Sequence, residues 1–253
     1  MVEFYFDDSL FDLVNDENST SNLMVRRDNF YKALYANRTE EVKSFVEQGV
    51  SLEDQDGGNY PLLIAASHSN NELIEFFIEK GVEIDCRNDI RHTPLMEAVF
   101  KNNEKGALLL LEAGASAFAQ SDLKVSACMK AIQTGQMDLV KEFVTRSSFP
   151  SINQTDKSGT TLLMFAAMSH DLDTLNLILS YNPKLNEKNA DGKTALDYAK
   201  EFCWEEGVKS IDSHVQKLAP AVPNEEKVVV VELQVPEKIE TPRLVSKISR
   251  RRP

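Results

Sequence analysis

The residues of this chain that could carry catalysis or bind a metal are four histidines and three cysteines, which are far apart in the sequence. A zinc site needs cysteine, histidine or carboxylate ligands at short, regular spacing, and none of the histidines has such a partner. The motifs of a glycine-rich phosphate loop, a paired-histidine zinc site and a nucleophile elbow do not occur. The sequence therefore predicts no catalytic residue, no cofactor and no metal site. The residues concerned are His68, His92, His170, His214, Cys86, Cys128 and Cys203.

The composition is that of an acidic chain of ordinary hydrophobicity. Its 253 residues are 42% hydrophobic and carry a formal net charge of −12. This charge argues against binding to nucleic acid or to acidic membrane surfaces, because both require a basic footprint. No apolar run approaches the roughly 18 residues of a membrane helix, and residues 1–14 lack the basic region of a secretory signal. Three widely spaced cysteines form no disulfide framework, so we expect a cytoplasmic, reducing compartment. Because the catalytic motifs above are absent, we also expect no small-molecule substrate.

One short pattern recurs and organises the chain. The segment "TPLMEAV" begins at Thr93, and a Thr hydroxyl can cap the free N–H groups of a helix. Proline at the first helical position loses no hydrogen bond, so the segment predicts a helix start. Counterparts lie on both sides of this segment at a spacing of about 33 residues. They begin at Asp28 and Tyr60 before it, and at Ser126, Thr161 and Thr194 after it.

The second half of each unit predicts another helix. Apolar residues recur at three positions spaced as on one helix face, and a glycine follows as a left-handed helix stop requires. The apolar sets are Val42, Phe45 and Val46; Ile74, Phe77 and Ile78; Ala107, Leu110 and Leu111; Val140, Phe143 and Val144; and Leu175, Ile178 and Leu179. The stop residues are Gly49, Gly81, Gly114 and Asn182. Helix pairs this short bury their apolar sides only by stacking.

The repeated unit resembles the ankyrin repeat. The segments "GTTLLMFAA", "ADGKTALDYAK" and "LLLLEAGAS" carry the likeness best, and the likeness covers roughly residues 28–214. The resemblance implies an all-α solenoid of five ankyrin-like repeats and a C-terminal capping repeat. We place this domain at residues 26–218.

Some positions depart from the family pattern. The turn glycine before each first helix, present as Gly58, Gly159 and Gly192, is replaced by Arg91 and Lys124 in the middle units. Gly106 falls inside a predicted helix, where it either allows a close backbone approach or marks a weak point. Ser147 replaces the stop glycine of the fourth unit, which predicts a bend or a wider gap after that unit.

The two ends of the chain differ from the repeats. Residues 1–25 are expected to form an acidic arm or a short helix, and Trp204 is expected to close the C-terminal end of the stack. Residues 219–253 predict a flexible tail with several prolines and a basic C-terminus. Its "VVVVELQV" segment could pair with the edge of a partner's sheet. Its basic end could be a docking segment or a nuclear address, or the tail could rest on the acidic body.

The resemblance implies that a protein partner contacts the loop tips and the exposed ends of the first helices. Apolar residues there indicate a binding patch, with Phe100 as the best anchor. The alternative is that Leu123 and Val125 fold down over the turn and that Phe100 is a core residue. The candidate residues are Ile90, His92, Leu123 and Val125 at the tips, and His68, Phe100, Lys101, Gln133 and Met168 on the helices. The acids Asp54, Asp56, Asp85, Asp89, Asp122 and Asp156 line the same edge and would steer a basic partner.

The function predicted from these features is protein binding by a scaffold, adaptor or inhibitor. One alternative is a secreted bacterial effector that engages a host protein in the host cytosol, with the tail as a translocation signal. A second alternative is an enzyme whose catalytic residues come together only in space, because such residues need not be neighbours in the sequence.

Overall fold

The computed structural model describes residues 20–146 and 152–218, and within these residues the regular structure consists of twelve α-helices. Residues 1–19, 147–151 and 219–253, which include most of the predicted arm, Ser147 and the predicted tail, lie outside the described residues. The helices are α2 (Thr20–Tyr35), α3 (Thr39–Glu47), α4 (Pro61–Ser67), α5 (Asn71–Glu79), α6 (Pro94–Phe100), α7 (Glu104–Glu112), α8 (Ala127–Gln133), α9 (Met137–Arg146), α10 (Leu162–Ser169), α11 (Leu172–Ser180), α12 (Ala195–Glu201) and α13 (Glu205–Leu218).

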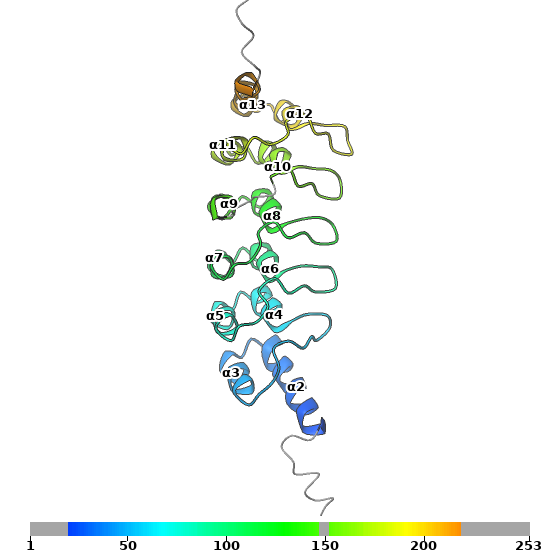
Figure 1. The fold of residues 1–253 in the computed structure, drawn as a ribbon, viewed down its shortest axis with the longest axis vertical. Helices are drawn as coiled ribbons and strands as arrows, with labels where there is room; N and C mark the ends of the chain where they lie inside the picture. Colours follow the sequence, from blue (N-terminus) through cyan, green and yellow to red (C-terminus); the bar gives the residue numbers. More distant parts are fainter. Residues whose placement is uncertain (1–19, 147–151, 219–253) are drawn as a thin grey trace, which may run out of the picture. The chain divides into compact units, whose positions relative to one another are not determined.

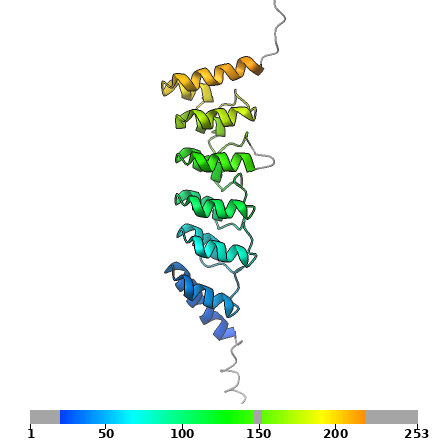
Figure 2. The same cartoon turned by 90° about the vertical axis from the view of Figure 1, so that its left-hand side faces the viewer.

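The helices form pairs that stack in chain order (Figure 1). The inner helices, from α2 to α12, pack on one another in turn, and the outer helices do the same from α5 to α13. Figure 2 shows the outer helices as successive rungs of this stack. Long loops project from the inner row on the side away from the outer helices (Figure 1). This arrangement confirms the all-α repeat solenoid that the sequence predicts.

Hydroxyl caps begin four of the inner helices. The side chains of Thr93, Ser126, Thr161 and Thr194 each accept a hydrogen bond from the backbone N–H three residues later. This bond satisfies one of the N–H groups that have no partner within the helix. The helix starts predicted from the repeated segment are therefore confirmed at these residues.

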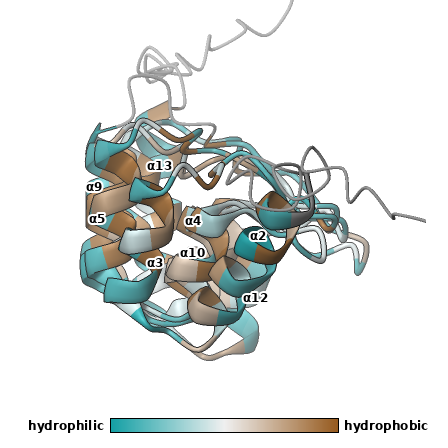
Figure 3. Ribbon diagram, turned by 90° about the horizontal axis from the view of Figure 1, so that it is seen from below, coloured by the Kyte–Doolittle hydropathy of each residue, from teal (hydrophilic) through white to brown (hydrophobic). Residues whose placement is uncertain are grey.

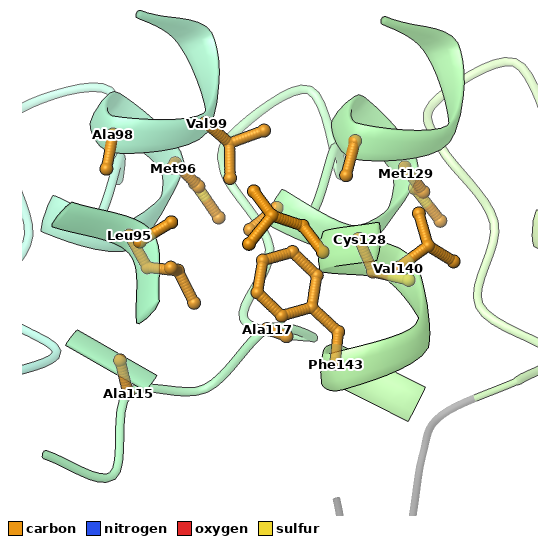
Figure 4. Close-up of a cluster of buried hydrophobic side chains, with 14 of the residues drawn as sticks. Leu95, Met96, Ala98, Val99, Ala115, Ala117, Cys128, Met129, Val140 and Phe143 are labelled. Atoms are coloured by element: carbon orange, nitrogen blue, oxygen red, sulfur yellow. The ribbon is translucent and has the colours of Figure 1, made fainter. Parts of the chain in front are cut away.

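The core lies between the inner and outer helices, where hydrophobic residues gather in a view along the stack (Figure 3). Figure 4 shows one section, in which Leu95, Met96, Cys128 and Phe143 meet, and each of these side chains is 0% exposed. Burial of a large apolar side chain contributes about 1.5–3 kcal/mol to stability. Cys128 packs here, and burial raises the pKa of its thiol to about 12.

The helix stops also follow the sequence prediction. Gly49, Gly81 and Gly114 have φ angles of 87°, 77° and 95°, and Asn182 has a φ of 50°. These values lie in the left-handed region, where glycine has no side-chain clash and asparagine is tolerated. Helices α3, α5, α7 and α11 therefore end where the repeat pattern places their last residues.

Gly106 permits a close approach between two units. A Cβ atom at Gly106 would lie 2.2 Å from Nδ2 of Asn103 and 2.8 Å from Oδ1 of Asn71. The Asn103 side chain accepts a hydrogen bond from the Gly106 N–H at 3.1 Å and donates one to Asn71 Oδ1 at 2.7 Å. Glycine leaves room for this link, so the close-approach interpretation of Gly106 is the one that fits.

The first inner helix is longer than the sequence pattern suggests. Helix α2 begins at Thr20, so residues 20–25 belong to it and not to the arm predicted for residues 1–25. Its first turns expose Leu23, Met24 and Val25, which have relative exposures of 43%, 67% and 57%. The sequence does carry a signal for this earlier start, because Asn18 and Ser19 directly precede Thr20 and are residue types typical of a helix N-cap. The repeat alignment, which begins at Asp28, passed over it.

The last helix pair has the polar outer face that a capping repeat needs. Three positions that the preceding unit buries carry exposed charged residues here: Met164, Ala167 and Leu179 correspond to Asp197, Lys200 and Asp212. Trp204 is buried, and a Cβ atom at Gly207 would lie 2.1 Å from its ring. Trp204 therefore packs directly on the backbone of α13, at the end of the stack where the sequence places it.

Candidate functional site

The loops before the inner helices end in tight turns that are bonded to one another along the stack. The N–H of Asp122 donates to the carbonyl oxygen of Ile90 at 3.2 Å, and the N–H of Lys157 donates to that of Leu123 at 3.0 Å. A third bond joins Ala190 to Ser158 at 2.8 Å. Four successive turns thus form one row. This row, residues 88–92, 121–125, 156–160 and 189–193, is called the tip ridge below.

Two neighbouring turns of the tip ridge expose large apolar side chains. Ile90 is 51% exposed and Leu123 is 60% exposed, at equivalent positions of consecutive units. Val125, by contrast, is half-buried and packs against the core. The alternative in which both residues fold down therefore holds for Val125 and fails for Leu123. Exposed apolar side chains at adjoining places are typical of an interaction surface.

The same two turns hold bulky residues in a backbone conformation that favours glycine. Arg91 has a φ of 60° and Lys124 a φ of 56°, whereas the equivalent Gly58, Gly159 and Gly192 have values of 74–77°. A residue with a Cβ atom loses about 1–2 kcal/mol in this region. The tip ridge therefore carries local strain at the two turns that expose Ile90 and Leu123.

Phe100 lies half-buried at the end of α6, among polar neighbours. The His92 ring meets it edge-on, with 4.9 Å between the ring centroids, and Lys130 Nζ lies 5.6 Å from its centroid. His92 Nδ1 is 2.8 Å from Glu97 Oε1. The structure thus brings His92 and Phe100 together. These contacts fix the orientation of the phenyl ring, so little side-chain entropy remains to be lost on binding.

The other predicted helix residues are distributed along the inner row. Lys101 and Gln133 are exposed at the ends of α6 and α8, and Gln133 Oε1 accepts a hydrogen bond from Lys130 at 3.2 Å. His68 is exposed after α4, with Nδ1 2.9 Å from the Ile64 carbonyl oxygen. Met168 is half-buried in α10 and packs against the core. His68 and Met168 lie in units other than that of Phe100.

Several acids of this edge are engaged within the protein. Asp54 lies 3.8 Å from Arg27, and Asp85 accepts a hydrogen bond from the Ser116 N–H at 3.1 Å. Asp156 accepts hydrogen bonds from two backbone N–H groups of its own turn, each at 2.8 Å. Asp89 and Asp122 remain exposed on the tip ridge. The row of acids expected to steer a basic partner is therefore shorter than its sequence count suggests.

The cysteines have different environments. Cys86 and Cys128 are buried, and burial raises the pKa of each thiol to about 12, whereas Cys203 is exposed. A thiol with so high a pKa is a poor nucleophile at neutral pH, because the thiolate is the reactive form. Among residues 20–146 and 152–218, histidine, cysteine and carboxylate side chains do not gather in threes as a metal site requires.

None of the helices described is both long enough and apolar enough to cross a bilayer.

Sequence reasoning missed two residues that hold Phe100 in place. Glu97 and Lys130 occupy equivalent positions in consecutive units, four residues after Thr93 and Ser126. Comparison of this position across the units would have shown a carboxylate followed by an ammonium group. In a second group, the ring centroids of Phe202 and His170 are 5.6 Å apart and the Phe202 ring stacks on that of Tyr198. This group was also missed, because the units were not compared position by position.

Comparisons with known proteins agree with this architecture. A family model described as ankyrin repeats (3 copies) matches residues 30–121 and 128–213. The Caenorhabditis elegans protein named Dauer abnormal formation protein 25 is 30% identical over 123 residues, which are 49% of this chain and 31% of that protein. The chain thus matches about a third of the length of this relative.

A solved structure is also similar. It is a chain from the Bd0816 predatory endopeptidase of Bdellovibrio bacteriovorus in complex with immunity protein Bd3460. The TM-score is 0.62 and the sequence identity is 26%, over 73% of this chain and 96% of that chain.

Proposed function

The chain belongs to the ankyrin repeat family, and we propose that it is a protein-binding module whose contact surface is the tip ridge together with Phe100 and the inner-helix ends beside it. The observation that carries this proposal is the exposure of Ile90 and Leu123 on adjoining turns. A partner that covers both residues removes two large apolar side chains from water, which favours association. The other large exposed apolar residues lie near the ends of the stack, on helices α2 and α13 and at Tyr181 and Phe202.

The group around Phe100 supports the same surface. An aromatic ring with a fixed orientation and a partly exposed face is a common interface anchor. The polar residues Lys101 and Gln133 lie exposed at the helix ends nearby and could form the hydrogen-bonding rim that surrounds such anchors. The proposed surface therefore has an apolar ridge, an aromatic anchor and a polar rim.

Among the roles of such a module, we favour an inhibitor that covers a partner enzyme. The similarity to a chain from an endopeptidase–immunity protein complex supports this role. The scaffold and adaptor roles use the same surface. An effector role requires, in addition, that the tail direct export, and the enzyme alternative requires a catalytic group that no observation here favours.

The test is affinity capture from cytosol with the full chain and with a 1–218 truncation in parallel. We expect both baits to retain the same protein, because the proposed surface lies within residues 20–218. A partner that is retained by the full chain and lost with the truncation would transfer recognition to residues 219–253. That result would contradict the proposal.

A further inference from the structure

Three consecutive turns of the tip ridge carry an exposed base: Arg91, Lys124 and Lys157. Within residues 20–146 and 152–218, none of these three side chains forms an ion pair, although many other bases do. On the fourth turn, by contrast, Lys193 is paired with Glu201 at 2.6 Å. The positive charges of the first three turns are therefore available to a partner.

The nearby acids are less available. Asp156, beside Lys157, is held by two backbone N–H groups of its own turn. The carboxylate of Asp89 lies against the preceding turn, where a Cβ atom at Gly58 would be 2.3 Å from its Oδ2 atom. Asp122 is the exposed acid for which no such contact is described. Each of the three turns holds one acid and one base, so their formal charges cancel. Among the described residues the bases are the groups without an ion-pair partner, whereas Asp156 and Asp89 already have close neighbours, so the bases are the charged groups most free for new contacts.

The backbone supports a role for two of these bases. Arg91 and Lys124 occupy the left-handed conformation in which three other units have glycine. Strain of this kind persists where the surrounding structure enforces it, and it concentrates at functional sites. Glycine at either position would relieve the strain but would remove the charge. At these two turns a charged side chain therefore stands where glycine would be less strained.

We infer that the tip ridge binds an acidic and apolar polypeptide segment of its partner. The apolar side chains of that segment cover Ile90 and Leu123, and its carboxylates pair with Arg91, Lys124 and Lys157. Charge-assisted hydrogen bonds of this type are stronger than neutral ones and fix the register of an interface. The inference rests on the proposed function and reverses the sign of partner charge that the count of acids in the sequence predicts.

The experiment selects peptides from a phage-displayed library of random 16-residue peptides on the immobilised full chain. The peptides recovered are synthesised, and their affinities are measured for the full chain and for four variants. R91E/K124E/K157E reverses the ridge charges, and K105E/K200E/K217E makes the same change in net charge at exposed bases away from the ridge. R91G/K124G removes two charges and the strain together, and I90S/L123S removes the apolar contacts.

We expect peptides rich in Asp or Glu and apolar residues. Their affinities should fall at least tenfold for R91E/K124E/K157E and less than twofold for the control reversal. R91G/K124G should melt at a higher temperature than the original chain and should also bind more weakly, which separates charge loss from misfolding. Basic peptides, or equal losses with both reversals, would overturn the inference. Peptides that depend on Ile90 and Leu123 but not on the bases would overturn it and leave the proposed function standing. A selection that yields no peptide dependent on the ridge would count against both.

Discussion

Replacement of Ile90 and Leu123 with serine should weaken the captured partner about 100-fold and leave the fold intact. Both side chains are more than half exposed in the free protein, so their truncation removes little folded-state packing. Each is worth about 1.5–3 kcal/mol when a partner buries it, and 1.4 kcal/mol corresponds to a tenfold change in Kd. The measurements are the Kd by isothermal titration calorimetry and the free energy of unfolding by urea denaturation.

A matched control is available at the C-terminal end of the stack. Val215 and Leu218 on α13 are 44% and 51% exposed and lie away from the tip ridge. The V215S/L218S variant removes a similar amount of exposed apolar surface, and we expect it to change Kd less than twofold. Equal losses in the two double variants would show that general surface hydrophobicity, and not the ridge, drives binding.

Replacement of Phe143 with alanine should destabilise the protein by about 3–5 kcal/mol, the range for a fully buried phenyl ring. The Phe143 side chain is 0% exposed and points into the core section shown in Figure 4. Each unit contacts only its neighbours, so a cavity at this point also weakens the contacts on both sides of the fourth unit. The free energy of unfolding from urea denaturation, followed by circular dichroism, measures the loss.

Phe100→Ala is the matched variant for this prediction. Its ring is half-buried, so we expect a loss below about 2 kcal/mol and a clear loss of partner affinity. If Phe100→Ala were as destabilising as Phe143→Ala, Phe100 would be a core residue and would not belong to the proposed surface. The two phenylalanines differ in burial while the deleted group is the same, which makes the comparison direct.

Repetition made most of the fold predictable from the sequence. A single Thr-Pro-Leu segment is a weak helix signal, but its return at a fixed spacing placed the caps, the apolar stripes and the glycine stops together. Gly106 was left with two interpretations because the deciding residues, Asn71 and Asn103, are 32 positions apart and meet only when the units stack.

The surface was harder to predict. Leu123 and Val125 are both apolar and two residues apart, and the sequence alone gave no reason to separate them. The left-handed conformation of Lys124 between them leaves Leu123 exposed, while Val125 packs on the core. The acids were counted as available because the N–H groups that Asp85 and Asp156 bind belong to the backbone, which carries no signal in the sequence.

The most direct test of the account is site-specific photo-crosslinking of the partner. A photoreactive amino acid is placed at Leu123 on the tip ridge or, as a control, at Glu75, an exposed residue of the outer helix α5. We expect a covalent adduct with the partner from position 123 and none from position 75. An adduct that forms at position 75 and not at position 123 would place the partner on the outer helices and contradict this expectation.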